Sequence, residues 1–97
     1  MIHHIKLGNT QEERRKVLRT MIRGGAVCLG GYKKAKIYGL LRCTSGMRMK
    51  AEHRVFFRDE EEAIKEGYRP CGHCLPEKYK LWKAGLAWAG NVQPHKN

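Results

Sequence analysis

The chain has 97 residues, about the length of one small domain, which excludes an enzyme built from two domains. Hydrophobic residues make up 41% of the sequence and charged residues 30%, which excludes a disordered or collagen-like chain. Twenty lysines and arginines against nine acidic residues give a formal net charge of +11, which favours an anionic partner.

The first predicted element is a basic amphipathic helix that begins after Thr10 and ends at Gly24. Thr10 and Glu13 have the spacing of a capping box, in which the hydroxyl and the carboxylate each accept a hydrogen bond from a backbone N–H group of the first turn. Apolar residues then recur at helical spacing, while basic residues occupy the rest of the helix surface. The apolar stripe consists of Val17, Leu18, Met21 and Ile22. We expect this stripe to pack against the rest of the domain.

Two short strands follow, over residues 26–29 and 36–41, and we expect them to form a hairpin. The segment between them is rich in glycine and lysine, and Gly30 and Gly31 are predicted to begin its turn. Residues 44–53 show no periodicity and are predicted to form a loop. The β-branched and aromatic residues 54–57 predict a third strand.

Two short helices complete the predicted elements. Asp59 can cap a helix over residues 60–66, with acidic residues in its first turn and Gly67 as its stop. Pro76 suits the first position of the last helix. The apolar side chains that this helix can bury are Tyr79, Leu81 and Trp82.

The four cysteines predict a metal site. Cys71 and Cys74 form a C-x-x-C pair, which places two thiolates on one tight turn. Cys43 lies 28 residues upstream of Cys71, at the end of a predicted strand, and is the third candidate ligand. The chain shows no export signal, so we interpret the cysteines as zinc ligands rather than as disulfides. Buried or redox-active thiols are the alternative interpretation.

Three segments of the sequence carry a family resemblance. They read IYGLLRC at residues 37–43, VFF at residues 55–57 and EEAIKEGYRPCGHCLP at residues 61–76. Together they resemble the zinc-binding domain at the N-terminus of Ada, the bacterial alkylation-response and DNA repair protein. The resemblance covers residues 36–76, and its most specific part is the ending, a helix followed by Gly-aromatic-Arg-Pro-Cys-x-x-Cys.

This resemblance implies the zinc site but argues against the family's reaction. In that family four cysteines bind zinc, and the first of them accepts a methyl group from a DNA methylphosphotriester. Cys43, Cys71 and Cys74 match three of the four, whereas Gly39 stands where the resemblance expects the methyl acceptor. Glycine offers neither a nucleophile nor a ligand, so we do not expect methyl transfer. Relative to that family, one residue is inserted between Cys43 and the strand at 55–57, so that loop is not carried over in detail.

The sequence therefore predicts an α+β fold, a small zinc-stabilised domain with an N-terminal helix, a short antiparallel sheet and two short helices. We divide it into a basic amphipathic helix (residues 1–25), an Ada-like zinc-binding domain (26–84) and a loosely held C-terminal tail (85–97). No run approaches the roughly 18 apolar residues of a membrane-spanning helix, and the N-terminus lacks the apolar region of a secretory signal. We expect a cytoplasmic protein that does not bind membranes.

The fourth zinc ligand stays open at this point. Cys28 is chemically suitable, although its place in a predicted apolar strand equally favours an inert core thiol. Water in an open position is another alternative, and it is the arrangement of catalytic rather than structural zinc. The imidazoles that can contribute are those of His3, His4, His53 and His73.

The leading hypothesis for function is a zinc module that binds nucleic acid, most simply DNA, without sequence preference. Between Arg14 and Ala51 the chain has eleven basic residues and no acidic one. A charged surface that only improves solubility is the alternative interpretation. The candidate phosphate contacts are Arg14, Arg15, Lys33, Lys34, Lys36, Arg48, Lys50 and Arg54.

Two other classes of function are compatible with the sequence. One is a hydrolase or nuclease in which zinc-bound water is exposed beside Gly39, with His53 or Glu52 as the general base. Zinc held by thiolates is a poorer Lewis acid than zinc held by histidines, which disfavours this class. The other is a structural or protein-interaction domain, because a fold does not by itself specify a function.

Overall fold

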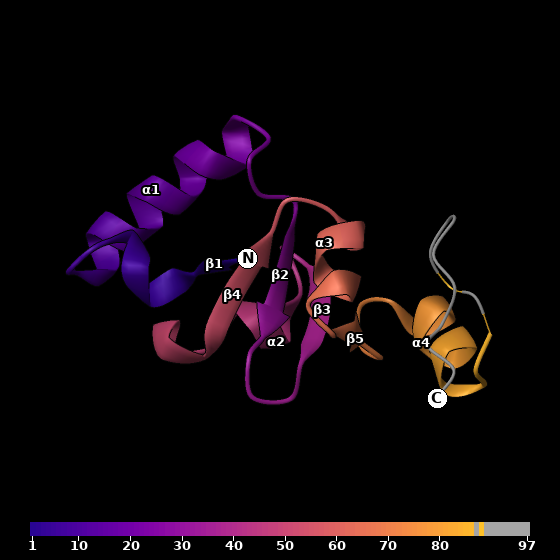
Figure 1. Cartoon of the computed structure of the whole chain (residues 1–97). Coiled ribbons are helices and arrows are strands. Elements are labelled where there is room, and N and C mark those ends of the chain that lie inside the picture. Colours follow the sequence, from indigo (N-terminus) through magenta and orange to yellow (C-terminus); the bar gives the residue numbers. More distant parts are fainter. Residues whose placement is uncertain (87, 89–97) are drawn as a thin grey trace.

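The computed structural model describes residues 1–86 and 88, which form a five-stranded sheet with short helices around it (Figure 1). The sheet has the order β1-β4-β2-β3-β5, and its neighbours are antiparallel except β3 and β5, which run parallel. The strands are β1 (Ile2–His3), β2 (Leu29–Tyr32), β3 (Ile37–Leu40), β4 (Arg54–Phe57) and β5 (Arg69–Pro70). The predicted α+β fold is confirmed, with a mixed rather than a purely antiparallel sheet.

The helices begin where the sequence places their caps. The Thr10 hydroxyl accepts a hydrogen bond from the backbone N–H of Glu13 at 3.1 Å, and the Asp59 carboxylate accepts one from Glu62 at 2.9 Å. In the described part of the chain, no helix is long and apolar enough to cross a membrane. The α-helices are α1 (Gln11–Arg23), α2 (Thr44–Met47), α3 (Glu60–Lys65) and α4 (Pro76–Lys83), and the 3-10 helices are η1 (His4–Leu7) and η2 (Ala51–His53).

Strand β4 divides the core into two clusters because its side chains alternate between the two faces of the sheet. Val55 and Phe57 pack on the face covered by α3, and Phe56 packs on the face covered by α1; all three are fully buried. The first cluster contains Tyr38, Val55, Phe57, Ala63 and Tyr68, and the second contains Leu18, Val27 and Phe56. Each cluster is small, and α1 and α4 lie at opposite ends of the molecule (Figure 1).

The predicted hairpin is present, but its turn lies further along the chain than expected. Gly30 and Gly31 belong to β2, and the turn lies at residues 33–36, where Lys36 adopts a left-handed φ of 54°. A Cβ atom on Gly31 would lie 2.8 Å from Phe57 Cε2 and 3.0 Å from Val55 Cγ2. This glycine is therefore explained by the close approach of β4 side chains and not by a turn.

Three further expectations about local structure are wrong. Residues 44–53 do not form a plain loop, since they contain α2 and η2. In the apolar stripe of α1, only Leu18 is buried and Met21 is half-buried. These two residues are three positions apart on the helix, and both pack on the cluster that contains Phe56. In α4 no side chain is fully buried: Tyr79 and Trp82 are half-exposed and stack on each other, and Leu81 is exposed.

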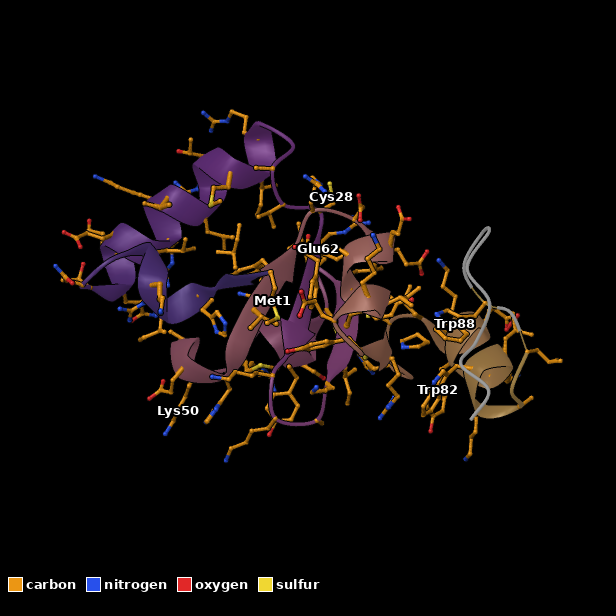
Figure 2. All side chains as sticks on the ribbon, viewed as in Figure 1. Met1, Cys28, Lys50, Glu62, Trp82 and Trp88 are labelled. Atoms are coloured by element: carbon orange, nitrogen blue, oxygen red, sulfur yellow. The ribbon has the colours of Figure 1, made fainter. Side chains whose placement is uncertain are left out.

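The predicted tail begins close to the domain. Trp88 is buried, and its indole N–H donates a hydrogen bond to the Tyr38 hydroxyl at 3.0 Å (Figure 2). Residues 87 and 89–97 lie outside the described residues, so the loosely held tail and the boundaries at residues 25 and 84 stay predictions.

Candidate metal centre

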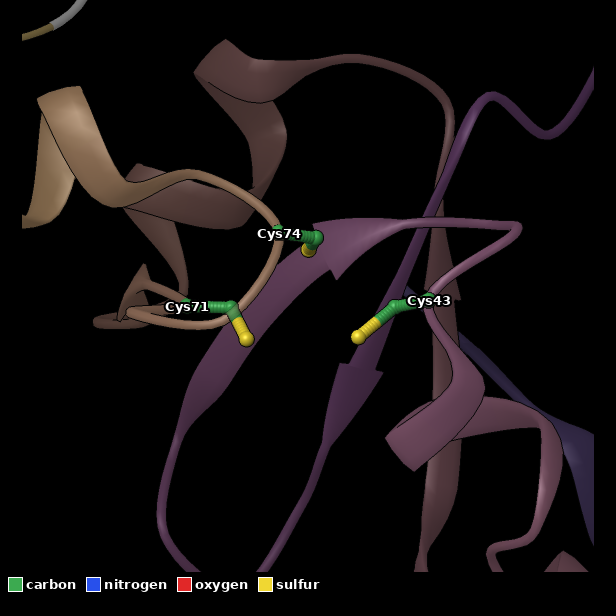
Figure 3. A group of neighbouring side chains, drawn as sticks. All are labelled: Cys43, Cys71 and Cys74. Carbon is green, nitrogen blue, oxygen red and sulfur yellow. The ribbon is translucent and has the colours of Figure 1, made fainter.

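Three cysteines from two distant segments of the chain meet at one end of β3. The sulfur atoms of Cys43, Cys71 and Cys74 all lie within 4.8 Å of one another. Figure 3 shows Cys43 just before α2, and Cys71 and Cys74 on the loop between β5 and α4, with their side chains turned toward a common point. Zinc–sulfur bonds of about 2.3 Å in a tetrahedron place sulfur atoms about 3.8 Å apart, so the cluster fits a zinc ion.

The parallel pairing of β3 with β5 brings these cysteines together. The backbone N–H of Cys71 donates to the carbonyl of Tyr38 at 2.8 Å and so extends that pairing by one residue. The chain then turns tightly, with the N–H of Leu75 donating to the carbonyl of Cys71 at 2.9 Å. On the other side, a turn after β3 is closed by the N–H of Cys43, which donates to the Leu40 carbonyl at 3.1 Å.

Backbone N–H groups surround the sulfur atoms. The N–H of Leu40 donates to Cys74 Sγ at 3.3 Å, and the N–H of His73 donates to Cys71 Sγ at 3.4 Å. The Cys43 sulfur accepts hydrogen bonds from the backbone N–H groups of Ser45 and Gly46 at the start of α2. Such donors favour the thiolate, which is the form that binds a metal ion.

The thiols of this cluster compete with one another for negative charge. Burial raises the pKa of Cys74 to about 12, as do the neighbouring Cys43 and Cys71, although the N–H of Leu40 opposes the rise. Burial also acts to raise the pKa of Cys43, but the N–H of Gly46 and other hydrogen bonds outweigh it, and this pKa is lowered. A divalent cation among the three sulfurs would relieve this competition and displace the remaining protons.

Gly39 faces the sulfur cluster directly. A Cβ atom on Gly39 would lie 2.7 Å from Cys74 Sγ, 3.1 Å from Cys71 Cβ and 3.9 Å from Cys71 Sγ. A side chain at residue 39 would therefore point at the sulfur cluster, and Cys74 would have to shift to make room for it. Because glycine has no side chain, only its backbone borders the site.

No other His, Cys, Asp or Glu side chain in residues 1–86 and 88 joins the three sulfurs. Cys28 is not part of this cluster, and it is exposed, so the alternative of a buried core thiol is wrong as well. His73 is exposed, and its Nε2 lies 3.5 Å from Thr44 Oγ1. The other candidates also lie elsewhere: His3 in β1, His4 against Phe56, His53 against Tyr32, and Glu52 on the surface.

The predicted phosphate contacts divide into separate groups. Arg14, Arg15, Arg48 and Lys50 line one hollow of about 420 Å³ between α1 and η2. Lys33 and Lys34 are exposed in the hairpin turn, and Lys36 borders a different hollow together with Lys65 and Arg69.

Arg54 differs from the other predicted contacts because it is half-buried. Its guanidinium carbon lies 4.8 Å from the centre of the Phe56 ring, and burial lowers its pKa. Arg69 was not among the predicted contact residues. Its guanidinium lies over the rings of Tyr79 and Trp82, at 5.0 and 5.2 Å from their centres. The Arg-Pro that precedes Cys71 was the available signal for Arg69.

Comparison with known protein families identifies the central part of the chain. The family model described as the metal-binding domain of Ada matches residues 25–77, which is more than half of the 97 residues. The match includes Gly39 and the three clustered cysteines and leaves out α1. Comparison with the curated proteins and with the solved structures gives no significant match.

Proposed function

Because the chain belongs to the family of the metal-binding domain of Ada, we propose that it is a zinc-binding module that binds nucleic acid and does not accept methyl groups. Zinc is the metal of this family and suits a cluster of three cysteine sulfurs. We assign Cys43, Cys71 and Cys74 as its protein ligands. Bound there, zinc supplies a cross-link between the end of β3 and the loop before α4.

The hollow between α1 and η2 is the observation that supports nucleic-acid binding. Arg14, Arg15, Arg48 and Lys50 come from two segments of the chain and converge on it, and Glu52 is the one acidic residue in its lining. A concave surface with this charge suits the phosphate backbone of a nucleic acid. Since phosphate contacts carry no sequence information, we expect binding to DNA to be sequence-tolerant.

A salt titration tests this proposal. Binding of labelled duplex and single-stranded DNA is measured by fluorescence anisotropy at several salt concentrations. On duplex DNA the logarithm of the affinity should fall with the logarithm of salt concentration by about 0.9 for each phosphate neutralised. Absence of binding even at low salt would refute the nucleic-acid part of the proposal and favour a protein-interaction domain.

Two matched triple variants locate the surface. Replacing Arg15, Arg48 and Lys50 with alanine should reduce the salt slope by up to about 2.7, since three contacts are lost. The comparison variant replaces Lys33, Lys34 and Lys36, which carry the same charge but lie at the hairpin turn. If the turn also contacts DNA, as the sequence predicts, the salt slope of this comparison variant will fall as well. Zinc content should stay unchanged in both variants.

The lack of methyl transfer is proposed from the position of Gly39. In the family resemblance this is the position of the methyl-accepting cysteine, and its Cβ direction points at the sulfur cluster. Without a thiolate at residue 39, the zinc has no activated nucleophile at that corner.

A further inference from the structure

A cavity of about 200 Å³ lies directly beside the cysteine cluster. Cys43 and Cys71 border it on one side. Its floor is formed by Gly30 and Gly39, which pair with each other across β2 and β3 and add no side chains of their own, while Cys71 and Cys74 lie close over Gly39. The remaining wall is mostly apolar and includes Tyr32, Ile37, Leu40 and Met49.

We propose that this cavity binds a small anionic thiol, whose sulfur becomes the fourth ligand of the zinc held by Cys43, Cys71 and Cys74. The inference rests on the zinc-site part of the proposed function and is independent of nucleic-acid binding. It goes beyond the family's chemistry because the fourth sulfur comes from a separate molecule and not from the chain.

The number of protein ligands favours a donor from outside the cluster. Zinc in a site of this kind takes four ligands, and the described residues bring together three. Gly39 borders the cluster without a side chain that could supply the fourth ligand, and Cys74 Sγ lies 2.7 Å from where its Cβ would be. The cavity that begins at Gly39 gives a small molecule access to the cluster.

The chemistry of the cavity selects a sulfur donor. A metal ion already held by thiolates favours a further soft ligand, and the apolar wall suits the carbon chain of an organic molecule. A water molecule takes up about 30 Å³ in the liquid, so a cavity of this volume has room for a molecule of several heavy atoms. On binding, the thiol releases its S–H proton to solvent, and its sulfur donates the electron pair to the metal; nothing is oxidised or reduced.

Arg54 gives the cavity its preference for an anion. Its side chain lines the cavity and is the one charged side chain in that lining. Among the described residues Arg54 has no carboxylate partner, and its one hydrogen bond, from Nη2 to the Leu41 carbonyl, is long at 3.5 Å. The buried Nε has no hydrogen-bond partner there. A carboxylate on the thiol can therefore pair with this guanidinium.

The test uses the full chain loaded with Co²⁺, which reports sulfur ligands through charge-transfer absorption. The protein is prepared with a non-thiol reductant and titrated with 3-mercaptopropionate or with 2-mercaptoethylamine, which carries a positive charge instead. The absorption should rise to saturation with both, and 3-mercaptopropionate should bind about tenfold more tightly because of a charge-assisted hydrogen bond to Arg54. Cobalt content measured after desalting checks that the thiol does not remove the metal.

Three variants separate the parts of the inference. Gly30→Val fills the floor of the cavity, where an added Cβ meets its nearest neighbours at 3.9 Å, and should abolish the response without changing the initial spectrum. Arg54→Gln should remove the preference for the anionic thiol. Gly39→Cys supplies the fourth sulfur from the chain, once Cys74 shifts to make room, so its spectrum should match that of thiol-saturated wild type.

Each contrary result has a distinct meaning. If wild type takes up cobalt but its spectrum does not respond to either thiol, or if Gly30→Val responds as wild type does, the thiol site is refuted while the zinc assignment stands. If wild type alone already shows four sulfur ligands, the inference is equally refuted. Failure to bind cobalt at all would refute both the metal assignment and this inference.

Discussion

At the scale of single residues, Gly39 has the largest chemical consequence in this molecule. A cysteine there would supply both a fourth metal ligand and a nucleophile, and glycine supplies neither. The backbone of residue 39 still lies against the sulfur cluster, since its Cβ direction points at Cys74 and Cys71. On the proposed function, this missing side chain is the reason why the metal site does not accept a methyl group.

The first prediction is that this protein takes no methyl group from DNA that contains methylphosphotriesters. The reason is the absence of a thiolate at residue 39, and intact-protein mass spectrometry after incubation with alkylated DNA is the measurement. A methyl adduct on any cysteine would contradict it, and peptide mapping would then show whether Cys43 has taken the role of acceptor. Gly39→Cys serves as the comparison, although Leu40-Leu41-Arg42 also differs from the family's segment.

The second prediction distinguishes the clustered cysteines from Cys28. Cys71→Ser should lose most of the bound zinc, because it removes one of three sulfurs, whereas Cys28→Ser should keep about one zinc per chain. Cys28 is a matched control because it is exposed and outside the cluster. Metal content is measured after dialysis against a weak chelator. Equal zinc loss in the two variants would overturn the ligand assignment.

At the scale of elements, the two glycines of β2 have different roles. Gly31 lies under Phe57 and Val55 of β4, whereas Gly30 lies on the opposite face, where it lines the cavity and an added Cβ would meet its nearest atoms at 3.9 Å. The first glycine lets a central strand approach the core closely. The second leaves the sheet uncovered next to the cysteines. Alternation of side chains along the strand explains why adjacent glycines serve one face each.

The third prediction follows from that difference. Gly31→Val should lower the free energy of unfolding by about 1–3 kcal/mol, because the new side chain overpacks the core against Phe57. Gly30→Ala is the comparison, and its effect should stay within about 0.5 kcal/mol because the new Cβ meets other atoms only at the ordinary contact distance of 3.9 Å. Urea unfolding of the zinc-loaded proteins measures both. A Gly31 variant as stable as wild type would show that β2 and β4 can separate without cost.

At the scale of the whole molecule, the two core clusters are small and the metal site lies between distant parts of the chain. The clusters hold five and three buried residues, and α4 buries none. The cysteines join the turn after β3 to the loop between β5 and α4. In so small a domain, a metal cross-link of this kind contributes a large share of the stability.

The fourth prediction is that removing zinc unfolds the domain. Structural zinc can supply roughly 10 kcal/mol or more of folding free energy, which is comparable to the whole free energy of unfolding of a small domain. Circular dichroism during treatment with a strong chelator, followed by readdition of zinc, measures the loss and recovery of structure. Full helical signal in protein shown to be free of metal would contradict a structural role for the ion.

The sequence by itself determined the features that depend on near neighbours along the chain. Thr10 and Asp59 cap their helices through hydrogen bonds that span three residues, and the strand at residues 54–57 follows from its composition. The pairing of Cys71 with Cys74 and the family resemblance could also be predicted from the sequence, because spacing within a short motif limits where its side chains can lie. The family match at residues 25–77 confirms that resemblance.

Only the tertiary structure decided features that depend on contacts between distant segments. The turn of the hairpin moved to residues 33–36 because Gly31 fits under Phe57, a neighbour 26 positions away. The separation of Cys28 from the other thiols and the cavity beside Gly39 follow from the pairing of β3 with β2 and β5. Such pairings are set by the packing of the whole sheet, and no local pattern of residues specifies them.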